Sequence, residues 1–323
     1  MLNSRFDTIE NYLKFYGLNI AAAAHEFVQF KSNGFELAGH IFIPLETGRS
    51  QRPTGVNDAL SLTGLRPKEY RATVILIHGY LNHCGLLSKL IKYLVEAGFA
   101  VAVFDLPGHG LSSGEPTAID DFSQYSDSLN DFMKIIRPKL NGQYHIIGHS
   151  TGAAVILEYL LACTERSRSD FDKVILAAPL ERTDWWLLEK IGFSISRLFS
   201  SFVPRVFRKV SSDKDFLRFI KYKDPLQAKK ISLKWVAAMF KWDQRIADAK
   251  ISNRPVFVIQ GLKDNIINWR HNIRFIQSKF SNTQVKLVEK CRHELFNESE
   301  EIRTMVFSQI KDYLEKQAIR PEE

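Results

Sequence analysis

A serine flanked by two glycines constrains the fold of this chain more than any other feature. Gly148-His149-Ser150-Thr151-Gly152 lies between an apolar run at residues 144–147 and a helical pattern at residues 153–161. A strand, a sharp turn and a helix in this order form a nucleophile elbow. A side chain at either flanking position would clash with neighbouring backbone, and the strained central residue holds its hydroxyl at the helix N-terminus. We therefore predict that Ser150 is a nucleophile.

A nucleophilic serine needs a general base, and the base needs an acid that orients it. The strand pattern at residues 255–260 leads into a loop that holds Asp264, and the short strand at 284–288 precedes a loop that holds His293. All three side chains then follow the carboxyl ends of predicted strands, where parallel sheets place their sites. The chain order Ser, Asp, His also fits a nucleophile elbow. We predict Ser150, Asp264 and His293 as a catalytic triad.

Two backbone N–H groups are candidates for binding an oxyanion. The apolar run at residues 74–77 leads into His78-Gly79-Tyr80. A backbone N–H just after such a strand acts together with the N–H that follows the nucleophile. We assign these two donors to the N–H groups of Tyr80 and Thr151.

Strand and helix patterns alternate along most of the chain. Strand patterns occur at residues 26–31, 35–43, 72–77, 99–104, 143–147, 173–177, 255–260 and 284–288, and helical patterns at 85–97, 119–136, 152–162, 269–280 and 299–317. The first two strands are joined by Ser32-Asn33-Gly34, which is a hairpin signal. The alternation predicts an α/β fold with a mostly parallel central sheet and helices on both faces.

The same patterns suggest how the chain is divided. We expect an N-terminal amphipathic helix within residues 1–24 that packs on the domain, an α/β core formed by residues 25–179 and 251–323, and a helical cap at residues 180–250, inserted after the sixth strand. Residues 46–70 are polar and irregular, and we expect a mobile surface insertion there.

The cap segment is rich in aromatic and large aliphatic side chains. Such residues above a nucleophile would form a deep apolar pocket suited to an acyl chain. We predict that Trp185, Trp186 and Phe193 bind the substrate, and that other aromatic residues of the segment form the core of the cap itself.

The cap segment also carries the net charge of the chain. Residues 181–250 hold 16 Lys and Arg against 8 Asp and Glu, so their net charge of +8 equals that of the whole chain. A cationic excess at a pocket entrance favours contact with an anionic head group or the surface of an anionic membrane. A solvated helical surface is the alternative interpretation. No nucleic-acid-binding motif accompanies the charge, so we do not expect nucleic acid as a partner.

The motifs taken together resemble those of the α/β-hydrolase superfamily. The resemblance rests on His78-Gly79-Tyr80, residues 105–110, residues 148–152, Asp264 and Arg292-His293-Glu294. The chain is most similar to the monoacylglycerol lipase and lysophospholipase branch, which is grouped with serine aminopeptidases of the S33 type. Residues 292–298 are similar to the catalytic-histidine loop of bacterial lysophospholipases. The resemblance covers roughly residues 25–318 and implies an α/β-hydrolase fold in which the cap sets substrate choice.

These observations predict a serine hydrolase that cleaves carboxylic esters without a metal or organic cofactor. The expected substrate is a lysophospholipid or a monoacylglycerol. An aminopeptidase would need an acidic group near the pocket to hold the free amine, whereas the cap is basic. Acyl transfer is a further alternative because it shares the acyl-enzyme. A non-catalytic binding protein of the same fold is expected to have lost the nucleophile or the histidine, and both are present here.

Cysteine usage and the first residues bear on localisation. Three cysteines, Cys84, Cys163 and Cys291, do not form a disulfide framework and suggest a reducing compartment. Asp7 and the short alanine run at residues 21–24 do not fit a signal peptide. No run approaches the ~18 apolar residues of a membrane span. We expect a cytoplasmic protein that is peripheral at the inner face of a membrane if its basic cap contacts lipid.

Overall fold

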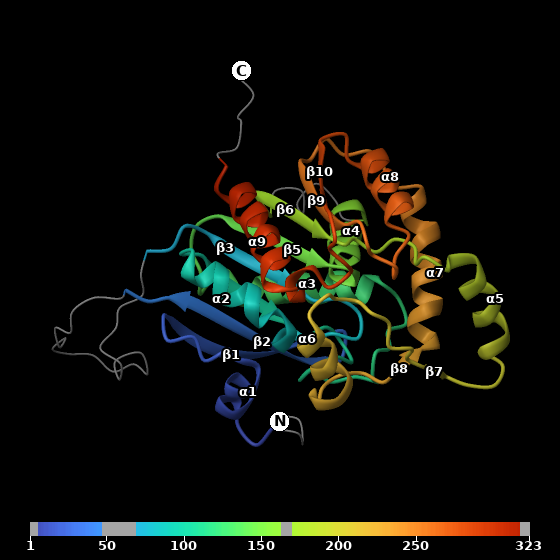
Figure 1. Cartoon of the computed structure of the whole chain (residues 1–323), viewed down its shortest axis with the longest axis horizontal. Coiled ribbons are helices and arrows are strands. Elements are labelled where there is room, and N and C mark those ends of the chain that lie inside the picture. The colour runs from blue at the N-terminus through green and yellow to red at the C-terminus, as the bar shows by residue number, and fades with distance from the viewer. Residues whose placement is uncertain (1–5, 47–68, 163–169, 317–323) are drawn as a thin grey trace.

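The computed structural model describes residues 6–46, 69–162 and 170–316. Eight strands form one sheet in the order β1-β2-β4-β3-β5-β6-β9-β10 (Figure 1). They are β1 Ala23–Ser32, β2 Phe35–Pro44, β3 Thr73–Ile77, β4 Ala100–Phe104, β5 Tyr144–His149, β6 Lys173–Ala177, β9 Val256–Gly261 and β10 Thr283–Val288. The β1–β2 hairpin and the β2–β4 pair are antiparallel, and the remaining neighbours are parallel. The prediction of a mostly parallel sheet led by a hairpin is confirmed.

Helices cover the sheet and leave its central strands without a solvent-facing side. Helix α2 (Ser88–Glu96), preceded by a 3-10 turn at Cys84–Leu87, packs beside α9 (Glu300–Glu315), and α3 (Ser123–Ile136) packs beside α4 (Thr151–Ala162). Helix α8 (Trp269–Lys279) follows β9 (Figure 1). In the part of the chain that the structure describes, no helix has the length and apolar character needed to cross a membrane.

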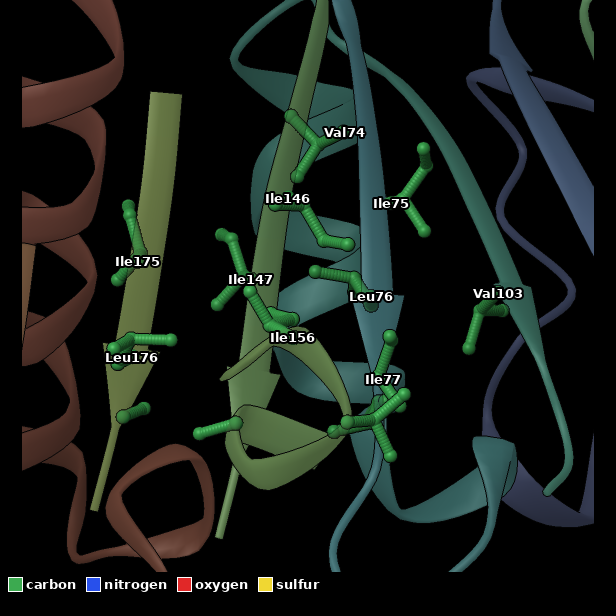
Figure 2. Close-up of a cluster of buried hydrophobic side chains, with 14 of the residues drawn as sticks. Val74, Ile75, Leu76, Ile77, Val103, Ile146, Ile147, Ile156, Ile175 and Leu176 are labelled. Atoms are coloured by element: carbon green, nitrogen blue, oxygen red, sulfur yellow. The ribbon is translucent and has the colours of Figure 1, made fainter. Parts of the chain in front are cut away.

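The continuous apolar runs of the central strands follow from this arrangement. Every residue of β3 and β4 is buried, because strands covered on both faces have no polar side. Figure 2 shows side chains of β3, β5 and β6 packed together, with Val103 of β4 and Ile156 of α4 beside them. This core holds the carboxyl ends of β5, β6 and β9 in fixed positions relative to one another.

Residues 180–250, the segment predicted to form a cap, lie between β6 and β9 in the chain. They contain α5 (Trp186–Ser196), β7 (Phe202–Pro204), α6 (Lys214–Arg218), a π-helical turn at Phe219–Lys223, β8 (Lys230–Ser232) and α7 (Leu233–Ala247). The segment is mostly helical, but β7 and β8 pair as a second, antiparallel sheet that the sequence did not predict. Three-residue strands are too short for alternating polarity to show. Figure 1 places α5 at the outer margin of the molecule, beyond α7.

The N-terminal helix is shorter than the expected span of residues 1–24. Helix α1 (Ile9–Tyr16) begins at Thr8, whose side chain accepts a hydrogen bond from the Asn11 N–H, and ends at Gly17 with a positive φ of 68°. It packs on the domain, where Tyr12 stacks on the buried His40. The expected insertion at residues 46–70 lies almost entirely outside the described residues.

One side of the cap is tied to both the core and α1. The Asp224 carboxylate accepts a hydrogen bond from the Tyr16 hydroxyl at 2.7 Å and pairs with the His83 ring at 3.0 Å. On the same side, the Lys89 ammonium lies 3.3 Å from the Asp213 carboxylate. Three distant parts of the sequence therefore meet at the end of the cap that contains α6.

Candidate active site

Ser150 lies on a sharp turn between β5 and α4, in the strained conformation expected of an elbow. Its φ is 53°, and its N–H donates to the Ala177 carbonyl at 2.9 Å. A Cβ added to Gly148 would lie 2.4 Å from backbone atoms of Gly152, and one added to Gly152 would lie 2.2 Å from the Ile77 carbonyl oxygen. Both positions therefore exclude any side chain, which explains the two glycines of the motif.

The three predicted triad residues meet at the carboxyl end of the sheet. His293, in the loop after β10, places its Nε2 3.0 Å from the Ser150 Oγ and its Nδ1 2.8 Å from the Asp264 Oδ2. Asp264 lies in the loop after β9. All three side chains are buried. A hydroxyl, an imidazole and a carboxylate in this chain of hydrogen bonds can move a proton away from the hydroxyl.

Asp264 is held as a carboxylate by its surroundings. Burial raises its pKa, but the charge and hydrogen bond of His293, the Ile266 N–H at 2.9 Å and the Gln260 amide at 3.1 Å outweigh this effect. The pKa of Asp264 is therefore below its ordinary value of 3.8. An ionised Asp264 can only accept, so His293 Nδ1 carries the proton and Nε2 is left to accept from the serine.

The base itself is more basic than an ordinary histidine. Burial lowers the pKa of His293, but its charge interaction and hydrogen bond with Asp264 raise it by more, so that it lies above 6.5. The adjacent Glu294 carboxylate acts in the same direction. A raised pKa strengthens the acceptance of a proton from Ser150.

The two candidate oxyanion donors are available beside Ser150. Neither the Tyr80 N–H nor the Thr151 N–H has a hydrogen-bond acceptor among residues 6–46, 69–162 and 170–316. The Tyr80 side chain fixes its own loop, because its hydroxyl donates to the Thr117 carbonyl at 3.0 Å and accepts from the Ser232 N–H at 3.1 Å. Both residues line the same cavity as Ser150.

A cavity of about 580 Å³ lies between the triad and the cap. This volume falls within the range of small-molecule sites, about 300–1,000 Å³. Much of the lining is apolar, and the large apolar side chains of core and cap that line it include Leu180, Leu188, Val203, Val236, Met239 and Ile266.

Two of the three predicted substrate-binding residues line the cavity. Trp185 and Phe193 do so, but Trp186 does not. Trp186 is only 6% exposed and packs edge-on against Phe240, with ring centroids 4.9 Å apart. The structure therefore places the Trp186 ring in the packing between α5 and α7 and not in the cavity lining.

The structure places two charged side chains, Glu294 and Arg205, in the lining of the cavity, which the sequence did not predict. Glu294 accepts hydrogen bonds from the Asn82 amide at 2.8 Å and the Asn297 amide at 3.3 Å. Burial raises the pKa of Glu294, but interactions with His149 and His293 and these amides leave it below its ordinary value. Arg205 lines the cavity as well. Glu294 belongs to the recognised histidine motif, whereas nothing in the sequence separates Arg205 from the other cap cations.

The histidines and the cysteine after β3 have protein partners. Nε2 of His78 accepts from the Leu106 N–H at 2.9 Å, His83 pairs with Asp224, and the Cys84 N–H donates to Asp105 at 2.7 Å. Within the described part of the chain, no group of three or more His, Cys, Asp or Glu side chains is placed to hold a metal ion.

A doubly covered, mostly parallel sheet with a serine elbow after β5 defines the α/β-hydrolase class. Residues 68–300 match the model of the family described as serine aminopeptidase, S33, and the chain belongs to this family. It is a hydrolase of the lipase and esterase type, in the monoglyceride lipase branch.

Individual relatives are distant but span most of both chains. A monoglyceride lipase homolog of monkeypox virus is 26% identical, covering 80% of this chain and 95% of its own. The monoglyceride lipase of Saccharomyces cerevisiae is 24% identical, covering 77% and 86%. The crystal structure of a soluble variant of that yeast enzyme with a substrate analog superposes with a TM-score of 0.72 at 18% identity, covering 92% and 97%. At this identity the superposition establishes the shared fold.

Proposed function

We propose that this chain hydrolyses the ester bond of monoacyl lipids, with monoacylglycerols and lysophospholipids as substrates. The observation that carries the proposal is the hydrogen-bonded set Ser150, His293 and Asp264 beside a largely apolar cavity. The relatives named as monoglyceride lipases support the same substrate class. Ester hydrolysis by a serine, a histidine and a carboxylate requires no metal or organic cofactor.

In the first half-reaction, the Ser150 Oγ attacks the ester carbonyl carbon while His293 Nε2 takes the hydroxyl proton. The carbonyl oxygen becomes an oxyanion, which the N–H groups of Tyr80 and Thr151 bind. Asp264 stabilises the imidazolium and keeps its orientation. As the intermediate collapses, the bond to the alcohol oxygen breaks, and His293 returns the proton to the departing alcohol.

In the second half-reaction, water replaces the alcohol. His293 takes a proton from the water as its oxygen attacks the acyl-enzyme, and the same N–H groups bind the second oxyanion. Collapse breaks the bond to Ser150, which regains the proton from His293, and the fatty acid is released. An alcohol in place of water would make the reaction an acyl transfer.

The cavity favours a lipid over a peptide with a free amino terminus. An aminopeptidase needs an anionic group that is free to bind the ammonium. Two carboxylates line the cavity, and both are engaged: two amides donate to Glu294, and the Thr183 hydroxyl donates to Glu189. The guanidinium of Arg205 in the same cavity would also repel an ammonium.

We further propose that α5 contacts the surface of an anionic membrane. Some of its residues line the cavity, while several large apolar residues protrude into solvent at exposures of 57–83%: Leu187, Leu188, Ile191, Ile195, Leu198 and Phe199, the last two just after the helix. Such a patch rarely occurs on a surface that faces only water. The positive charge of the cap suits an anionic surface. The substrate would then pass from the bilayer into the cavity along α5.

The central test measures fatty-acid release from 1-monoacylglycerol, a lysophospholipid and a short-chain ester. Wild type and Ser278→Ala, which changes an exposed serine on α8, should both hydrolyse the monoacyl lipids. Ser150→Ala should fall below about one thousandth of wild type. Undiminished release by Ser150→Ala, or turnover of the short ester alone, would refute the proposal. Release of acylated alcohol instead of free acid would identify an acyltransferase.

A further inference from the structure

Arg205 is a half-buried cation whose hydrogen-bonding capacity is largely unused. A guanidinium carries five N–H donors. In the described part of the chain, one acceptor is found for them, the Ala228 carbonyl, 3.3 Å from Nη1. The guanidinium carbon also lies 4.5 Å from the centre of the Phe207 ring. Most of the Arg205 donors therefore have no partner within residues 6–46, 69–162 and 170–316.

The charge of Arg205 persists in this setting. Burial lowers the pKa of Arg205 to about 10, and the charges of Glu294 and Asp224 oppose that effect. The group is therefore protonated at neutral pH. A desolvated cation without matched acceptors destabilises a fold unless another anion or acceptor satisfies it.

The nearby carboxylates do not form an ion pair with the Arg205 guanidinium. No carboxylate of the described residues lies within 4.0 Å of the Arg205 guanidinium, the limit for an ion pair. Glu294 is close enough to act on the charge of Arg205, yet it is already engaged by the amides of Asn82 and Asn297.

A second guanidinium follows on the same cap segment. Arg208 also lines the cavity, is exposed, and donates from Nη1 to the Asn265 carbonyl at 3.1 Å in the loop that holds Asp264. Two cations three residues apart therefore line a cavity that also contains the large apolar side chains of core and cap. Such a division fits a ligand with an apolar chain and an anionic end.

We infer that Arg205, assisted by Arg208, binds the phosphate of a lysophospholipid and thereby makes the enzyme prefer anionic monoacyl lipids to neutral ones. This inference rests on the proposed function and specifies its substrate class. The planar guanidinium suits two phosphate oxygens at once, and charge-assisted hydrogen bonds of this kind are the strong ones.

Two substrates that differ only in the phosphate test the assignment: 1-palmitoyl lysophosphatidic acid and 1-palmitoylglycerol, each in mixed micelles with a neutral detergent. Arg205→Gln should raise KM for the phosphate-bearing lipid by about 10- to 100-fold and leave the neutral lipid within about twofold. Arg205→Lys should keep part of the preference. Arg218→Gln is the matched control, since it removes the same charge from an exposed cap position outside this cavity.

The neutral lipid also reports on folding, because a misfolded variant loses activity on both substrates. Inorganic phosphate, tested as a competitor of 1-palmitoylglycerol hydrolysis, distinguishes a lipid head group from a site for free phosphate. Equal loss of both activities in Arg205→Gln, an equal effect of Arg218→Gln, or phosphate inhibition without turnover of the anionic lipid would overturn the assignment. Turnover of neither lipid by wild type would instead refute the proposed function itself.

Discussion

The ring of Tyr80 stacks on the ring of Trp235 with centroids 3.8 Å apart and planes 18° apart. Tyr80 belongs to the loop after β3, and Trp235 belongs to α7 of the cap. The residue whose backbone N–H is a candidate oxyanion donor is therefore also a contact between core and cap. This relationship links the stability of the cap to the geometry of the candidate active site.

Removing the stacking partner should affect both properties. Trp235→Ala is expected to lower the free energy of unfolding by about 3–5 kcal/mol, because it deletes a buried ring. It should also reduce kcat by up to about 100-fold, since the Tyr80 loop loses its support. Urea unfolding and steady-state kinetics measure the two effects. Trp186→Ala, another buried cap tryptophan, should lose similar stability but keep kcat, and equal kcat values in the two variants would contradict the link.

The pH dependence of turnover should follow His293. The base must be neutral, so kcat/KM should fall as pH drops through its pKa, which lies above 6.5. Asp264→Asn removes the carboxylate that raises this pKa, so the acid limb should move to lower pH, and kcat should fall by about 10⁴-fold. Rates measured from pH 5 to pH 9 test both points. If the acid limb of the Asp264→Asn profile stays at the wild-type pH, the limb reports the titration of a group other than His293.

The same pair should stabilise the fold within a defined pH window. The pKa of His293 is raised, so its contribution is complete below 6.5 and is lost as pH rises through the folded value. The pKa of Asp264 is lowered, so its contribution is present above 3.8 and is lost as pH falls through the folded value. The stability difference between wild type and Asp264→Asn should therefore be greatest between pH 3.8 and 6.5. A difference that grows above that window would contradict the pairing.

The tightness of the elbow predicts an unusually large effect of one methyl group. Gly152→Ala should prevent folding or displace Ser150, since its Cβ would lie 2.2 Å from the backbone oxygen of Ile77. Gly192→Ala, on helix α5, meets no atom within 4 Å and should leave stability unchanged or raise it by about 1 kcal/mol. Soluble yield and circular dichroism provide the comparison. A folded, active Gly152→Ala protein would show that the elbow relaxes easily.

The proposed membrane contact can be tested by flotation with vesicles. Replacing Leu187, Ile191 and Phe199 together by Gln should weaken binding to phosphatidylglycerol vesicles by at least about tenfold. The reason is that the variant lacks three exposed apolar side chains whose transfer from water into the bilayer would favour binding. Ile251→Gln, which changes an exposed apolar residue outside α5, should bind as wild type does. Added salt should weaken wild-type binding. Unchanged binding of the triple variant would exclude α5 as the contact.

The core and the triad could be predicted because each depends on local patterns with one structural solution. Buried strands such as β3 are almost continuously apolar, and only glycine fits at positions 148 and 152. The predicted strand ends differ from the observed ones by a few residues at most. Ser150, Asp264 and His293 follow strand ends, and parallel strands bring those ends together.

The cap was less predictable because its contacts are tertiary. An apolar residue there can face the cavity, the cap core or solvent. Phe193 lines the cavity, Trp186 is buried in the cap and Leu187 is exposed, and composition does not distinguish these environments. The short β7–β8 pair left no periodic signal. Arg205 could not be distinguished from other cap cations, because its role depends on missing partners and not on its neighbours in sequence.

The links of Asp224 to Tyr16 and His83 give the cap two unequal sides. The side with α6 is a fixed wall, joined to the core and to α1 by buried polar contacts, while α5 stands at the outer margin with much of its surface in water. An acyl chain of a different length would be accommodated on the opposite side of the cap, along α5, where fewer contacts restrain the chain. The enzyme would then be strict toward the polar end of its substrate and tolerant of differences in the length of the acyl chain.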